Sequence, residues 1–163
     1  MKRKILLTVL SLTAIFLGAP CIGLALATPS TTVSGQITVV GSPTRIEAAG
    51  ESGNLFMDIQ GVGVFTGDIE GTFTAGAAWV FHKIGTPDMR ANAHIVNYVS
   101  ATVMGKTGTL TFMLYANTGK MINNWVIYGG TGELANLHGQ GTYYAVTPGG
   151  DTLAYEGQIH FDP

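Results

Sequence analysis

Residues 91–104, ANAHIVNYVSATVM, alternate between two kinds of side chain at every step. The odd-numbered positions are small or apolar apart from Asn97, whereas the even-numbered ones include His94, Tyr98 and Ser100. Successive side chains of a β-strand point to opposite faces of the sheet, so this period of two predicts a strand with one buried face. The predicted buried face consists of Ala91, Ala93, Ile95, Asn97, Val99, Ala101 and Val103.

The rest of the chain from Thr28 onward has the same β character and no sustained helical spacing of apolar residues. Short runs of alternating and β-branched residues recur between glycines, which is typical of an all-β protein. Some of the earlier runs can belong to one long bent strand. The predicted strands cover residues 33–40, 43–49, 54–66, 68–83, 91–104, 108–117, 121–128, 140–147 and 152–161.

Glycine is frequent, with 23 residues, and several lie inside predicted strands, among them Gly61, Gly63, Gly71 and Gly157. Glycine weakens a flat sheet but suits the bulges and corners of a strongly bent one. Closure of an antiparallel sheet into a barrel also removes exposed strand edges. We therefore predict an all-β fold, an antiparallel closed barrel, formed by a single domain of residues 28–163.

The first 27 residues have the three parts of a secretory signal peptide. A basic start, KRK at residues 2–4, precedes the apolar run ILLTVLSLTAIFLG, and ALA at 25–27 is a small-x-small cleavage site. The alternative is an uncleaved membrane anchor, but the run is short of the roughly 20 apolar residues that a spanning helix needs. We expect a signal peptide at 1–27 and a secreted, periplasmic or cell-surface protein that begins at Thr28 and has no stable membrane span.

Cleavage there would change the composition of the exported domain. Cys21, the only cysteine, would be lost, so disulfides could not stabilise the domain. Lipid attachment to Cys21 is not predicted, because Pro20 stands where lipoprotein processing normally needs Gly or Ala. The domain would keep five basic residues against ten acidic ones, which argues against nucleic acid as a partner because phosphate binding needs a concentrated basic surface.

The glycine-rich stretch GGTGELANLHGQG, residues 129–141, resembles a phosphate-binding loop at first sight. Such a loop needs a following helix and a lysine after a glycine, and this stretch has room for only about two helical turns and contains no lysine. We expect a structural turn formed by Gly130, Thr131, Gly132 and Gly139. Thr131 or Gly132 would cap the turn, Glu133 would lie near its positive end, and Leu134 and Leu137 would fill the barrel mouth.

Three segments together indicate a family resemblance: FTGDIEG at 65–71, GKTGTLTF at 105–112 and IYGGTGELANLHGQG at 127–141. Their order and spacing resemble an uncharacterised prokaryotic family with an allene-oxide-cyclase-like barrel, which is similar in fold to the plant allene oxide cyclases and dirigent proteins. The resemblance implies an eight-stranded antiparallel barrel, often trimeric, with an apolar cavity for a small molecule. It implies no catalytic residue, because the matching motifs are turns and strand glycines.

Clusters that could carry catalysis or bind a metal are weak in the sequence. The four histidines, at 82, 94, 138 and 160, have no close spacing, so we interpret them as scattered surface residues and predict no metal site. No Gly-x-Ser-x-Gly motif is present, which argues against a hydrolase of that type. Asp68 and Glu70 could form a carboxylate pair, but we interpret them as part of a solvated outer face with Ile69 turned inward, because alternation alone explains this arrangement.

The predicted interior contains room and one polar group. The alanines on the face of Asn97 leave space, and a buried amide needs a partner, either a neighbour such as Tyr115 or Tyr128 or a bound molecule. Aromatic residues could stack on a ligand, although they are also the ordinary filling of a small barrel. The candidate ligand-binding residues are Asn97, Tyr115, Trp125 and Tyr128.

These features favour an exported barrel that binds a small apolar molecule in its interior and needs no cofactor. Two alternatives remain open from the sequence. The first is an isomerase or cyclase that folds a flexible apolar substrate inside the barrel. The second is a structural or partner-binding module with a filled barrel.

Overall fold

The computed structural model describes residues 28–49 and 53–163, which fold into eight antiparallel strands. The predicted signal peptide at 1–27 lies outside the described residues. The strands are β1 (Thr31–Ala49), β2 (Asn54–Gly67), β3 (Ile69–His82), β4 (Arg90–Val103), β5 (Lys106–Asn117), β6 (Asn123–Gly132), β7 (Leu137–Ala145) and β8 (Thr152–Phe161). None of the described residues forms a helix long and apolar enough to cross a membrane.

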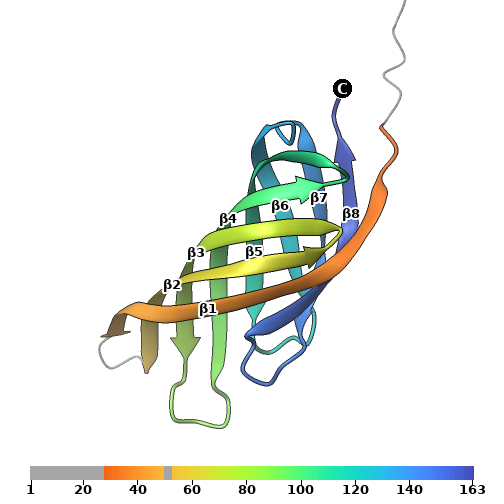
Figure 1. The fold of residues 1–163 in the computed structure, drawn as a ribbon. Helices are drawn as coiled ribbons and strands as arrows, with labels where there is room; N and C mark the ends of the chain where they lie inside the picture. Colours follow the sequence, from red (N-terminus) through yellow and green to blue (C-terminus); the bar gives the residue numbers. More distant parts are fainter. Residues whose placement is uncertain (1–27, 50–52) are drawn as a thin grey trace, which may run out of the picture.

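Each strand pairs with its sequence neighbour, and β1 pairs with β8, so the sheet closes into a barrel (Figure 1). The prediction of an all-β, closed antiparallel barrel is therefore confirmed. The turn between β6 and β7 lies at the upper end in Figure 1, and the β5–β6 and β7–β8 loops lie at the lower end.

The two predicted strands at 33–40 and 43–49 are one continuous strand, β1. Its pairing with β2 shifts register between Pro43 and Arg45, which marks a β-bulge. Proline has no N–H to donate to the ladder, and a bulge is one of the places where a sheet tolerates it. The bulge lets the strand bend without ending, as the possibility of one long bent strand anticipated.

Strand β4 alternates as its sequence predicts. The odd-numbered residues from Ala91 to Val103 are buried or half-buried, whereas Asn92, His94 and Tyr98 are exposed. The same alternation on β8 buries Tyr155 and Ile159. The inward faces of all strands meet inside the barrel.

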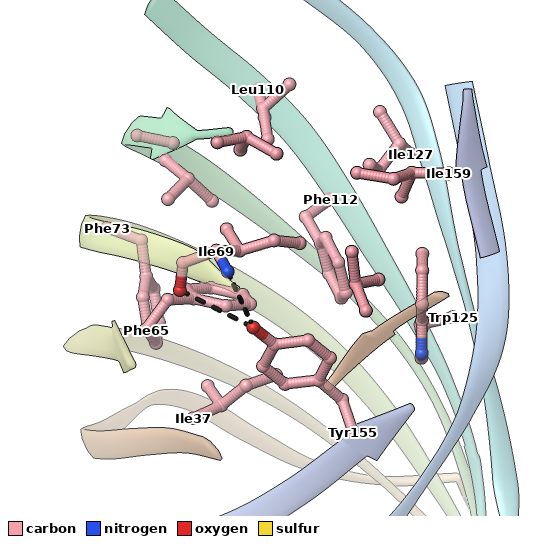
Figure 2. Packing of buried hydrophobic residues seen from close by; sticks show 14 of the residues in the cluster. Ile37, Phe65, Ile69, Phe73, Leu110, Phe112, Trp125, Ile127, Tyr155 and Ile159 are labelled. Atoms are coloured by element: carbon pink, nitrogen blue, oxygen red, sulfur yellow. Dashed lines mark hydrogen bonds between the residues drawn. The ribbon is translucent and has the colours of Figure 1, made fainter. Parts of the chain in front are cut away.

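Large apolar side chains fill the half of the barrel next to the β6–β7 turn, which we call the packed half. Phe65 contacts Phe73 and Phe112 edge to face at ring-centroid distances of 5.3 and 5.0 Å, and Phe112 stacks on Trp125 at 4.9 Å (Figure 2). Leu134 and Leu137 are fully buried at the end of this half, as expected for residues that fill the barrel mouth. The dense packing here supplies the apolar burial that a domain without disulfides requires.

In the glycine-rich stretch at 129–141, β6 ends at Gly132, a turn follows at residues 133–136, and β7 begins at Leu137, with no helix. Gly132 has a positive φ of 63°, a conformation that glycine adopts without the Cβ clash. A Cβ on Gly130 would collide with the backbone oxygen of Leu134, and one on Gly139 would lie 2.6 Å from Ile159 Cγ2. Thr131 O accepts a hydrogen bond from Leu134 N at 3.2 Å, so the chain turns tightly. Gly130, Thr131 and Gly132 form the end of β6 at this turn, and Gly139 lies in β7.

Candidate functional site

A cavity of about 880 Å³ occupies the other half of the barrel, which we call the open half. All eight strands contribute inward-facing side chains to its wall, and the β5–β6 and β7–β8 loops surround its mouth. The strand residues that line it are uncharged, and Lys120 and Asp151 are the charged lining residues, both from the loops. Representative wall residues are Ile37, Val39, Ile59, Ala77, Ile95 and Leu153.

The cavity begins where the inward residues become small. Gly61 pairs with Ala75, and Ala75 pairs with Asn97, so these three residues lie side by side on β2, β3 and β4. Gly41 of β1 stands opposite Gly61 and continues the row. In the neighbouring level of the packed half, Phe73 pairs with Val99, and both are buried. Small side chains on three adjacent strands leave a volume that their neighbours do not fill.

The mouth loops are tied to the barrel wall by hydrogen bonds. Asp151 O accepts from Val39 N at 2.9 Å, which attaches the β7–β8 loop to β1. Thr118 Oγ1 accepts from Ala91 N at 2.8 Å, and Ala91 O accepts from Thr118 N at 2.9 Å, which attaches the β5–β6 loop to β4. The entrance is thus held in a defined shape.

Asn97 is buried, with 1% of its surface exposed, and it lines the cavity. Its Nδ2 donates a hydrogen bond to Phe112 O, its register partner on β5, at 3.0 Å. The partner of the amide is therefore a backbone oxygen, and neither Tyr115 nor Tyr128 fills that role. Asn97 has a structural bond and a place in the cavity wall at the same time.

The other three predicted ligand-binding residues do not line this cavity. Tyr115 is 46% exposed and stacks on His94 on the outer face, at a centroid distance of 5.0 Å. Tyr128 is 76% exposed because it alternates with Trp125 and Ile127, which are buried on β6, so its side chain lies on the outer face. Trp125 is buried in the packed half, where its Nε1 donates to Thr142 O and Glu156 O, both at 3.1 Å. The expectation that the two tyrosines could face the interior is wrong.

Tyr143 on β7 is a cavity residue that sequence reasoning left among the general aromatic residues. It is 4% exposed, and its hydroxyl has no hydrogen-bond partner among residues 28–49 and 53–163. Burial raises the pKa of Tyr143 to about 12, so the phenol stays protonated well above neutral pH. Its register partner on β8 is Tyr155, which the alternation of β8 places inward, so the strand pairing would have assigned Tyr143 to the interior.

Tyr155 is a buried phenol in the packed half, and its hydroxyl has hydrogen-bond partners. Its hydroxyl accepts a hydrogen bond from Ile69 N at 3.0 Å and lies 3.4 Å from Thr66 O and Ile69 O (Figure 2). Burial is the main reason that the pKa of Tyr155 is raised to about 12, and the hydrogen bond from Ile69 opposes that rise. The two buried phenols differ in that one has partners and the other has none.

The fold brings together two of the four histidines, which the sequence left scattered. His138 and His160 are register partners on β7 and β8 and stack at 5.7 Å. Each places its Nε2 3.3 Å from a carboxylate oxygen of Asp162. Within the part of the chain that the structure describes, no group of three or more His, Cys, Asp or Glu residues is arranged to hold a metal ion.

The acidic residues in FTGDIEG are structural or solvated. Asp68 lies in the turn between β2 and β3, where its Oδ2 accepts a hydrogen bond from Ser34 N at 2.7 Å. Glu70 is exposed, and Ile69 between them is fully buried. This arrangement corresponds to the simpler of the two interpretations of the pair.

The geometry defines a class of protein: a closed eight-stranded antiparallel barrel that is packed at one end and hollow at the other. The chain is similar to the solved structure of a protein of unknown function from the DUF3224 family of Shewanella oneidensis MR-1. The two share 19% identity over 83% of this chain and 99% of that one, with a TM-score of 0.67. At this identity the similarity shows the fold alone.

Two pterocarpan synthase dirigent proteins are also similar in structure, each with 12% identity and TM-scores of 0.47 and 0.46. They cover 88% and 83% of this chain, and the chain covers 95% and 97% of theirs. The expected similarity in fold to an uncharacterised family is confirmed by the DUF3224 structure. No family model and no curated protein matches the chain by sequence.

Proposed function

We propose that the protein binds a small, largely apolar molecule in the open half of the barrel, and that it does so outside the cytoplasm after export. The observation that carries the binding proposal is the cavity of about 880 Å³. This volume lies within the range of roughly 300–1,000 Å³ typical of small-molecule sites. The basis for export is the signal-peptide pattern of residues 1–27.

The character of the wall supports an apolar ligand. Its strand residues are mostly aliphatic, aromatic or small, and the polar ones include Asn97 and Tyr143. Ligand sites generally combine a predominantly apolar wall with a few polar groups that fix orientation. A charged ligand would lose its hydration here without an opposite charge to replace it.

The test uses N-phenyl-1-naphthylamine, a neutral probe whose fluorescence rises in apolar surroundings. The wild-type protein is expected to bind it saturably. Ala75→Phe places a large ring into the cavity, because Ala75 lines the wall beside Asn97, and it should abolish or greatly weaken this binding.

The matched control is Thr74→Phe, since Thr74 is the adjacent residue and its side chain is exposed on the outer face. Both variants should retain the circular dichroism spectrum of the barrel. If Ala75→Phe is folded and binds the probe as the wild type does, the interior site is wrong. Separately, mass spectrometry of solvent extracts of the purified wild-type protein identifies any small molecule that it carries.

A further inference from the structure

The hydroxyl of Tyr143 differs from the other buried polar groups of this barrel in its lack of a hydrogen-bond partner among the described residues. Asn97 donates to Phe112 O, Trp125 donates to two backbone oxygens, and the Tyr155 hydroxyl accepts from Ile69 N. Among the described residues, Tyr143 Oη is the buried side-chain polar atom for which no partner exists. Tyr143 is also a residue of the cavity wall.

An unpaired buried hydroxyl lowers stability, because it has lost its hydrogen bonds to water without gaining others. Nearly all buried polar groups in proteins are paired, so an exception calls for a physical reason. The packed half provides hydrogen-bond partners for its buried phenol, Tyr155, so this fold can pair a buried phenol. A donor left unpaired beside an empty volume is explained if a bound molecule supplies the acceptor.

The surroundings restrict what that molecule can be. A phenol with its ordinary pKa near 10 is already protonated at neutral pH, and burial raises the pKa of Tyr143 further, so its hydroxyl can donate a hydrogen bond. The strand residues of the wall carry no charge, and the two charged lining residues, Lys120 and Asp151, lie in the mouth loops and have opposite signs. The interior therefore favours a neutral acceptor over a carboxylate or phosphate.

We propose that the Tyr143 hydroxyl donates a hydrogen bond to a carbonyl or ether oxygen of a neutral, largely apolar ligand in the open half of the barrel. This assignment rests on the proposed function and adds to it the chemical class of the ligand. An apolar body fills the cavity, and an uncharged oxygen pairs with Tyr143. A pure hydrocarbon would leave the hydroxyl unpaired and would bind less selectively.

The test compares two probes of nearly the same shape, benzophenone and diphenylmethane, which differ in a carbonyl at the central carbon. Each is titrated against bound N-phenyl-1-naphthylamine in the wild-type protein and in Tyr143→Phe. The variant should weaken benzophenone binding about three- to tenfold, the usual range for loss of one neutral hydrogen bond. Its affinity for diphenylmethane should be unchanged.

Melting temperatures of the ligand-free proteins provide a second, independent measurement. Tyr143→Phe should melt no lower than the wild type, because the hydroxyl it removes has no partner. Tyr155→Phe is the matched control and should melt lower, because it deprives Ile69 N of its acceptor.

The outcomes separate the two proposals. Equal effects of Tyr143→Phe on both probes, or none on either, would overturn the role of Tyr143 and leave the apolar site intact. A fall in melting temperature as large as that of Tyr155→Phe would also overturn it, since the hydroxyl would then have a structural partner. Failure of all three probes to bind the wild-type protein would overturn the proposed function itself.

Discussion

Two strand glycines should respond in opposite directions to the same substitution, glycine to alanine. Gly157 on β8 lies where a Cβ would collide with the Trp125 ring and with Gln140 O, and would come within 2.8 Å of Gly141 Cα. Gly76 on β3 is exposed, and a Cβ there would meet no atom within 4 Å. At Gly157 the neighbouring strand and the Trp125 ring lie too close for a Cβ, whereas at Gly76 there is space for one.

The structure sets the expected magnitudes. Gly157→Ala overfills the packed half and must move backbone or the Trp125 ring, so it should reduce the free energy of unfolding by about 2–3 kcal/mol. Gly76→Ala removes flexibility from the unfolded chain without a clash and should raise that free energy by about 0.5 kcal/mol. With roughly 4 °C per kcal/mol for a domain of this size, the melting temperatures should differ by about 10 °C or more.

Urea unfolding followed by circular dichroism, together with calorimetric melting temperatures, measures both variants. Equal m-values would show that the change lies in stability and that the cooperativity of unfolding is preserved. The reasoning is refuted if both variants shift stability in the same direction by similar amounts. In that case the close contact of Trp125 with Gly157 does not limit packing in the barrel.

Three other predictions concern the turn and the export signal. Gly132→Val should lower the melting temperature, because φ at Gly132 is 63° and a β-branched residue there costs about 1–3 kcal/mol; unchanged melting with lost ligand binding would instead make the turn a binding site. Hydrogen bonds from Thr107 lower the pKa of Glu133 below 4.5, so the stability advantage over Glu133→Gln should be present at neutral pH and disappear as the pH falls through that lowered pKa. N-terminal sequencing of the exported protein should find Thr28 first, and a membrane-retained chain beginning at Met1 would contradict this.

The fold could be predicted because the alternation of polar and apolar residues and the positions of the glycines are visible in the sequence of each single strand. On β4 the two faces differ clearly in polarity, and the structure buries the expected one. On β5 the contrast is weaker, since Met113 and Tyr115 make the outer face partly apolar too. Alternation on β5 alone therefore does not show which face of the sheet Tyr115 occupies. Its pairing with the exposed His94 on β4 places it on the outer face.

Part of the candidate site could have been assigned from alternation within one strand. Tyr128 lies outward because it alternates with Trp125 and Ile127, which are buried on β6. Tyr143 and Tyr144 are adjacent, so one must face inward and the other outward, and the polar residues His138, Gln140 and Thr142 share the face of Tyr144. The buried one is Tyr143, and Tyr144 is 50% exposed.

The location of the cavity follows from residue size at successive levels of the barrel. The alanines of β4 that suggested room are buried elsewhere: Ala101 belongs to the packed core, while Ala91 and Ala93 are not among the residues that line the cavity. The room comes instead from Gly41, Gly61 and Ala75, which stand side by side on β1, β2 and β3. Because the contacts of Phe112 with Phe65 and Trp125 lie in the packed half, that half can carry the stability of the barrel while the open half stays hollow. Substitutions in the two halves should therefore have different effects. Those beside Trp125 should change the free energy of unfolding, and those beside Ala75 should change ligand affinity.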